Sequence, residues 1–96
     1  MKNKIFDLGQ TVMTRTINNE IADSEPFAVE ITKAFARHCV GDWGDLCKED
    51  KQLNELSLTS ENQGRLFSAY NTIKGKIYII TEWDRSATTI LFANEY

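Results

Sequence analysis

The sequence is poor in the residues that mark special architectures, with one proline, one histidine and two cysteines among 96 residues. The cysteines, Cys39 and Cys47, are too few for a disulfide framework, so we expect free thiols in a reducing compartment. No segment is rich enough in proline or glycine to separate two domains, and the length is that of one domain. The chain therefore predicts a single domain over residues 1–96.

Long apolar runs are also missing. No stretch approaches the roughly 18 apolar residues that a membrane-spanning helix requires. The first ten residues carry two lysines, but Asp7 and Gln10 interrupt the apolar segment that a secretion signal would need. We therefore expect a cytoplasmic protein that does not associate with a membrane.

Positive charge is scarce, because 11 lysines and arginines stand against 14 acidic residues and the net charge is −3. The imbalance is concentrated in residues 20–62, which hold ten acidic side chains and four basic ones. Nucleic-acid backbones are bound by basic faces, so this acidic middle argues against direct nucleic-acid binding. The acidic middle has two interpretations. It suits a basic protein partner, such as the nucleic-acid-binding surface of a host complex, or it is simply the solvated side of the helices.

The last third of the chain has the composition of β-strands. Ile77–Ile80 and Thr88–Phe92 are β-branched and aromatic runs, and Asp84–Ser86 lies between them where the chain must turn. Arg65–Tyr70 predicts a strand before this pair, and Ile5–Leu8 predicts a short first strand. Consecutive antiparallel strands with short links form a meander.

Three helices are predicted before the meander. Met13, Ile17 and Ile21 recur every four residues and predict a helix over Thr11–Ala22. Apolar residues recur at helical spacing from Phe27 to His38 and predict the strongest helix.

Local signals mark where the strongest helix begins and ends. Ser24 is placed to accept backbone N–H groups as its N-cap, Pro26 lies in its first turn, and Gly41 stops it. A shorter polar helix is predicted over residues 48–58, with Leu53 and Leu56 as its apolar contacts. The predicted fold is a two-layer α+β sandwich, a three- to four-stranded antiparallel sheet covered on one face by about three helices.

Few residues suggest catalysis or ligand binding. His38, Cys39 and Cys47 lack the close pairing that zinc sites use, so we predict no metal. No glycine-rich phosphate loop or dinucleotide motif is present, so we predict no cofactor. His38 is either a partly buried structural imidazole or the general base of a small polar active site. That alternative site would comprise His38, Asp42, Asp45, Glu82 and Arg85.

Two polar loops are candidate contact surfaces. In Gly41–Asp45 a tryptophan lies between two acids and two glycines, which suits either a recognition hot spot or a lid folded onto the core. Glu82–Arg85 forms the tip of the main hairpin and would supply a polar rim beside Trp83. With the acidic helix before the meander, these loops define a predicted partner-binding set: Asp42, Trp43, Asp45, Glu49, Asp50, Glu55, Glu82, Asp84 and Arg85.

The segments Gly41–Asp45, Arg65–Tyr70 and Ile79–Thr89, read together, resemble a group of small proteins from bacterial plasmids, integrated elements and phages. Proteins of this group open like Asp7–Arg15 and end like Asn94–Tyr96, so the resemblance covers nearly the whole chain. They often carry labels such as hypothetical, plasmid-related, or subunit M of a type I restriction system. The last label does not apply literally, because the chain is too short for a methyltransferase and lacks its glycine motif.

The resemblance implies a genomic setting and no mechanism. Members usually have a smaller residue where Trp83 stands, so it implies no special role for that side chain. We therefore predict a non-enzymatic, protein-binding accessory protein of a mobile element, such as an anti-CRISPR or anti-restriction inhibitor of host defence. The small enzyme described above is the alternative, and a homodimer formed through a sheet edge remains open.

Overall fold

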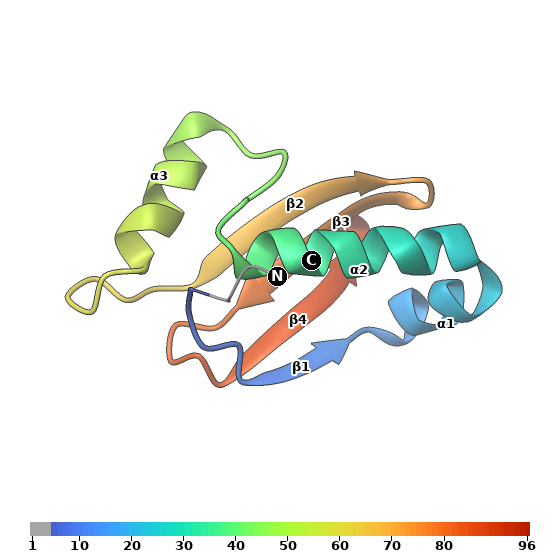
Figure 1. Cartoon of the computed structure of the whole chain (residues 1–96), viewed down its shortest axis with the longest axis horizontal. Coiled ribbons are helices and arrows are strands. Elements are labelled where there is room, and N and C mark those ends of the chain that lie inside the picture. Colours follow the sequence, from blue (N-terminus) through green and yellow to red (C-terminus); the bar gives the residue numbers. More distant parts are fainter. Residues whose placement is uncertain (1–4) are drawn as a thin grey trace.

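The computed structural model describes residues 5–96 and has the α+β class that the sequence predicts (Figure 1). Along the chain the elements are β1 (Gln10–Met13), α1 (Arg15–Asp23), α2 (Glu25–Cys39), α3 (Lys48–Ser57), β2 (Leu66–Thr72), β3 (Gly75–Thr81), β4 (Ala87–Phe92) and a short 3₁₀ turn, η1 (Ala93–Glu95). The strands form one sheet in the order β1-β4-β3-β2.

The three C-terminal strands form the predicted antiparallel meander. Ile79 of β3 lies opposite Ser68 of β2 and Ile90 of β4, so β3 is a central strand, as the apolar residues on both of its faces predicted. The sheet as a whole is mixed and not purely antiparallel, because β1 runs parallel to β4 at the outer edge.

The first strand does not lie where the sequence placed it. Ile5–Leu8 is not a strand; the strand is Gln10–Met13, a segment that was predicted to begin the first helix. Backbone pairing with β4 decides this, because the Gln10 N–H donates to Ser86 and the Thr14 N–H donates to Ile90. Helix α1 begins only at Arg15, where the Thr14 hydroxyl caps it by accepting from the Ile17 N–H at 3.2 Å.

Helix α2 matches its sequence signals and carries the core on one face of the sheet. The Ser24 hydroxyl caps it by accepting from the Phe27 N–H at 3.3 Å, and Pro26 lies in its first turn. Phe27 is fully buried and stacks on Phe92 of β4, with ring centroids 5.7 Å apart. The rest of this core cluster comprises Ile17, Ile31, Ala34, Tyr70, Ile77, Ile79 and Ile90.

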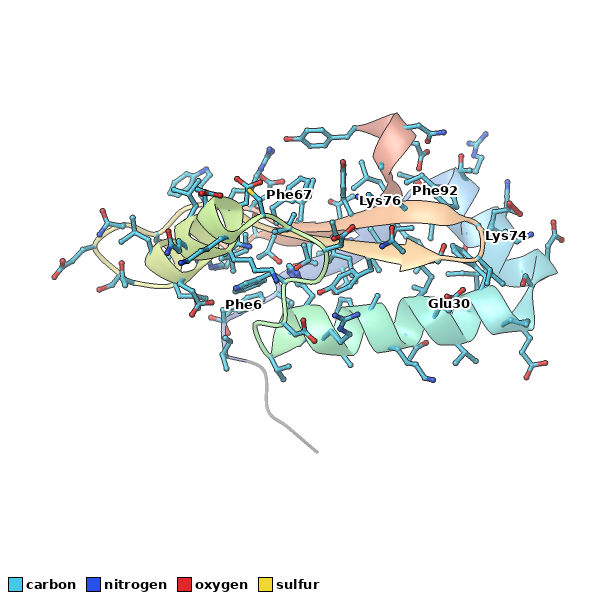
Figure 2. The ribbon with its side chains drawn as sticks, turned by 90° about the horizontal axis from the view of Figure 1, so that it is seen from above. Phe6, Glu30, Phe67, Lys74, Lys76 and Phe92 are labelled. Atoms are coloured by element: carbon cyan, nitrogen blue, oxygen red, sulfur yellow. The ribbon has the colours of Figure 1, made fainter. Side chains whose placement is uncertain are left out.

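Helix α3 lies beside the sheet at the β2 edge, α2 crosses one face of the sheet, and α1 lies beyond the end of β1 (Figures 1 and 2). The prediction that Leu53 and Leu56 are its apolar contacts is wrong, because these side chains are 60% and 51% exposed. Asn54 is turned inward instead and is 3% exposed. Its amide bonds the edge of β2, which an apolar side chain could not do.

The sheet face opposite α2 carries a second aromatic group. Phe67 and Tyr78 lie there with ring centroids 4.6 Å apart, and Tyr96 packs edge-on against both after the η1 turn. Figure 2 shows Phe67 on the opposite side of the strands from α2. The tip of the β2–β3 hairpin is tied to α2, because the Glu30 carboxylate accepts from the Ile73 N–H at 3.0 Å.

Candidate protein-binding surface

The only histidine is buried and hydrogen-bonded to a chain of hydroxyl groups. His38 is fully buried at the end of α2, with Nδ1 2.5 Å from the Ser68 hydroxyl and Nε2 2.9 Å from the Thr81 hydroxyl. The chain continues from Thr81 to Thr88 at 2.8 Å and ends at the Leu8 carbonyl, 2.7 Å from the Thr88 hydroxyl. Every polar atom of the ring is therefore satisfied by neutral partners.

The terminal carbonyl fixes the direction of the three hydrogen bonds that lead from the imidazole to Leu8. A carbonyl only accepts, so Thr88 donates to Leu8, Thr81 donates to Thr88, and His38 Nε2–H donates to Thr81. In a neutral ring Nδ1 then accepts from Ser68, which gives the Nε2–H tautomer. Burial agrees with this assignment, since it lowers the pKa of His38 from 6.5 to about 4.

The alternative enzyme site is not assembled around His38. Both ring nitrogens bond to hydroxyls, and no carboxylate among residues 5–96 orients the imidazole. Asp42 is engaged by Arg37 at 2.7 and 3.1 Å, and this hydrogen-bonded pair lowers the pKa of the Asp42 carboxyl. Asp45 lies 3.3 Å from the Asn71 amide and 3.3 Å from the Lys76 ammonium group, which together lower its pKa.

Trp43 belongs to the interior, which corrects its place in the predicted contact set. The side chain is 4% exposed, stacks on Phe6 at 6.2 Å between centroids, and meets the His38 ring edge-on. Its indole N–H donates to the Glu55 carboxylate at 2.6 Å. The tryptophan is therefore the lid on the core that the sequence left open as one interpretation, and it anchors α3 through Glu55.

The predicted hairpin tip is bonded through Arg85 to the region around the end of α3. Arg85, at a positive φ of 59°, donates to the carbonyls of Ser57 at 2.8 Å and Gly64 at 2.5 Å. These bonds join the hairpin tip to the last residue of α3 and to the segment that follows it, and burial lowers the pKa of the Arg85 guanidinium. The Arg85 side chain is thus engaged within the fold, which also corrects its place in the predicted partner-binding set.

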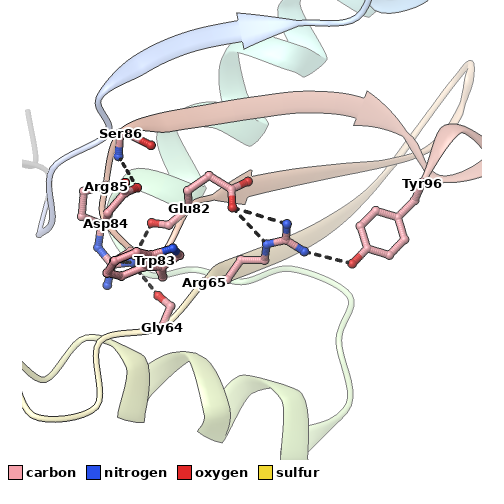
Figure 3. A network of polar contacts seen from close by, with 8 residues as sticks. All are labelled: Gly64, Arg65, Glu82, Trp83, Asp84, Arg85, Ser86 and Tyr96. Carbon is pink, nitrogen blue, oxygen red and sulfur yellow. Dashed lines mark hydrogen bonds and ion pairs between the residues drawn. The ribbon is translucent and has the colours of Figure 1, made fainter.

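The other charged groups at the tip have local partners, as Figure 3 shows. Arg65 bridges Glu82, at 3.3 Å, and the Tyr96 hydroxyl, also at 3.3 Å. Asp84 accepts from the Ser86 N–H at 3.0 Å, and its pKa is lowered chiefly by hydrogen bonding to Ser86. Trp83 is 63% exposed at this tip.

Two more of the predicted residues, Glu49 and Asp50, lie on α3 beside two exposed leucines that were not predicted as partner contacts, Leu53 and Leu56. We call these four residues the α3 outer surface. Glu49, Leu53 and Leu56 are four and three residues apart, so they lie on one stripe of the helix. The Glu49 and Asp50 side chains are exposed and make no hydrogen bond or ion pair within residues 5–96. This surface presents two leucines framed by two unpaired carboxylates.

Several contacts hold the α3 outer surface in place. The Asn54 amide donates to the Phe67 carbonyl at 2.7 Å and its oxygen accepts from the Phe67 N–H at 3.1 Å. Glu55 bonds Trp43, and Arg85 bonds the Ser57 carbonyl at the end of the helix. Sequence reasoning found the acids but missed the leucines, since an apolar pair at helical spacing is usually assigned to the core.

Comparison with protein-family models, curated proteins and solved structures gave no match for this chain. Within residues 5–96, no helix combines the length and the apolar character needed to cross a membrane. In the same part of the chain, no cluster of three or more histidine, cysteine, aspartate or glutamate side chains is arranged to hold a metal ion.

Proposed function

We propose that this is a non-enzymatic binding protein whose contact site for another protein is the α3 outer surface. One observation carries the proposal: Leu53 and Leu56 are more than half exposed on a helix that is fixed to the sheet by its polar side chain Asn54. Exposed apolar groups framed by polar ones are typical of protein interaction sites. A helix presenting residues i and i+3 fits an apolar groove on a partner.

The charge around the leucines indicates the chemistry of the partner. Asp42, Asp45 and Glu82 are neutralised by Arg37, Lys76 and Arg65, respectively. Glu49 and Asp50 form no ion pair within the part of the chain that the structure describes. Complementary charge speeds association and selects partners, so the partner surface would place lysine or arginine around an apolar pocket.

The way α3 is held also favours recognition. A helix already fixed by Asn54, Glu55 and the Arg85 contact with Ser57 loses little further freedom when a partner binds. Binding therefore avoids much of the ordering cost that a flexible segment would carry. An enzymatic role has no comparable support, because the sole histidine is buried among neutral hydroxyls.

The setting we propose follows the sequence resemblance. The protein would act in the cytoplasm as an accessory protein of a mobile element and inhibit host defence of the CRISPR or restriction type. Its acidic helix would cover a basic surface that otherwise binds nucleic acid. Such an inhibitor would compete with nucleic acid by charge and shape, with no chemical step.

Affinity capture from a bacterial lysate tests the surface, with partners identified and then purified for titration. The double variant Leu53→Ser/Leu56→Ser should weaken binding of the same partner at least about tenfold, since buried anchors commonly contribute more than 1 kcal/mol each. Glu49→Lys/Asp50→Lys should slow association and reduce its dependence on salt. The matched control is Val29→Ser, which removes a 46% exposed apolar side chain from α2.

Two outcomes separate the surface from the setting. If the leucine variants bind the partner as well as wild type while Val29→Ser weakens binding, the α3 outer surface is not the contact. If the wild-type protein changes neither restriction nor CRISPR interference in cells, the proposed setting is wrong, although the binding surface could still hold for another partner.

A further inference from the structure

The two edges of the sheet are finished in different ways. On β2, the outward N–H and C=O of Phe67 are both bonded by the Asn54 side chain. The outward N–H and C=O of Ala69 are bonded by the Trp43 carbonyl at 3.1 Å and the Asp45 N–H at 2.7 Å. These contacts close the β2 edge to any further strand at these positions.

Within residues 5–96, no segment pairs with the outer side of the other edge, formed by β1. The N–H groups of Gln10 and Thr14 bond to β4, so alternation turns the backbone groups of Thr11 and Met13 outward. All four residues of β1 are exposed, and the strand has no proline, lysine or other charged side chain of the kind that blocks edge pairing. Four backbone hydrogen-bonding groups are thus presented in a row along an accessible edge (Figure 1).

We propose that β1 pairs antiparallel with β1 of a second copy of this chain, about a two-fold axis at Val12. In this register Thr11 of each copy lies opposite Met13 of the other, and their outward N–H and C=O groups exchange four hydrogen bonds. The two Val12 residues then face each other as a non-hydrogen-bonded pair, the kind in which side chains approach most closely. An isologous pairing of this kind uses the same patch on both copies.

The side chains around the axis suit a second copy. Val12 is 37% exposed, so the pairing covers an apolar group on the face opposite α2. On the α2 face, Met13 borders an apolar groove of about 230 Å³ that Ile31, Phe35 and Ile90 also line. A cross-strand neighbour of Met13 would extend over this groove.

Charge is complementary in the same arrangement. Asp7 precedes β1 and Arg15 follows it, and both are exposed. Antiparallel pairing brings the end of one strand that precedes Arg15 to the end of the other that follows Asp7, so side chains of opposite charge flank the contact at both ends. A parallel partner strand would instead set like charges together.

The contact is short, so we expect the two copies to associate weakly. A strand of four residues buries less than the roughly 1,200 Å² of a stable interface, so the dimer should be weak and reversible. We expect a dissociation constant of about 10 μM to 1 mM, in the range of transient contacts.

Sedimentation equilibrium of the full chain, up to about 1 mM protein, tests the pairing through charge exchange at the axis. Val12→Lys and Val12→Glu place like charges opposite each other in the homodimer, so each alone should dimerise at least about tenfold more weakly than wild type. An equimolar mixture of the two should recover or exceed the wild-type affinity. Ile73→Lys is the matched control, since it adds the same charge at a 63% exposed residue of the β2–β3 turn.

A wild-type protein that stays monomeric throughout this range would overturn the proposal and leave the β1 edge to a strand from another protein. A dimer that Val12→Lys leaves intact, or a mixture that shows no recovery, would overturn it equally. Far-ultraviolet circular dichroism of each variant should match wild type, because Val12 lies outside the core cluster.

Discussion

Lowering the pH from about 7.5 to about 5 should remove about 2 kcal/mol from the free energy of unfolding, and His38 should account for nearly all of the change. The imidazole is neutral in the folded chain because burial lowers its pKa from 6.5 to about 4. The unfolded chain, with an ordinary histidine, therefore binds a proton that the folded chain does not. Stability is complete above pH 6.5 and falls as the pH drops toward 4.

The magnitude follows from the difference in pKa. Each tenfold difference in proton affinity is worth about 1.4 kcal/mol, so the difference between a pKa of 6.5 and one of about 4 gives a full loss of about 3.5 kcal/mol, reached well below pH 4. At about pH 5 most of that loss has already occurred. The aspartates with lowered pKa values, Asp42, Asp45 and Asp84, act at lower pH, because their stabilising effect is lost only as the pH falls below about 4 to 5.

Urea unfolding followed by tryptophan fluorescence at each pH measures this loss. The variant His38→Gln is the control, since its amide is neutral throughout and its stability should be nearly constant over the same range. Proton NMR gives a second reading, because the chain has one histidine and its ring signals are unambiguous. In the folded protein these signals should not titrate until about pH 4.

Two results would refute the argument. One is a free energy of unfolding that is equal at the two pH values, or that falls as much in His38→Gln as in wild type. The other is a ring signal of the folded protein that titrates near pH 6.5, which would mean that the imidazole reaches solvent and that the hydroxyl chain does not seal it.

Two further predictions concern the segments that finish the β2 edge. Asn54→Ala should lower the free energy of unfolding by about 1–3 kcal/mol, because it strips both partners from the Phe67 backbone, whereas Leu53→Ala should change it by less than about 0.5 kcal/mol; equal effects in urea unfolding would mean that α3 packs the other way round. Gly44→Ala should cost more than about 2 kcal/mol, because the φ is +77° and the new Cβ would lie 2.0 Å from the Ala69 carbonyl oxygen. Gly75→Ala, at a φ of +118° with no atom within 4 Å of the new Cβ, should cost less, about 1–2 kcal/mol; a thermal melt that ranks the two variants the other way would contradict the close approach of Gly44 to the Ala69 carbonyl.

Local sequence patterns correctly predicted α2 and β3. The cap at Ser24, the proline in the first turn and the apolar stripe from Phe27 define α2 without any knowledge of the sheet. Apolar residues on both faces of β3 predicted a central strand, and the structure places it between β2 and β4.

Patterns that continue across an element boundary misled the prediction of the N-terminal region. Met13 keeps the four-residue spacing of Ile17 and Ile21, yet it ends β1, because its segment pairs with β4 almost 80 residues away. No local signal shows such a pairing, since the bonds are between backbone groups that every residue carries.

The candidate binding surface also depends partly on the sequence and partly on the tertiary structure. The acids of α3 and their excess over lysine are a property of the sequence alone, as is the absence of a nucleotide or metal motif. Which side of α3 faces the protein was decided by the tertiary structure. The bare N–H and C=O of Phe67 at the sheet edge are better satisfied by the Asn54 amide than by a leucine, so the polar residue turned inward and Leu53 and Leu56 were left in solvent.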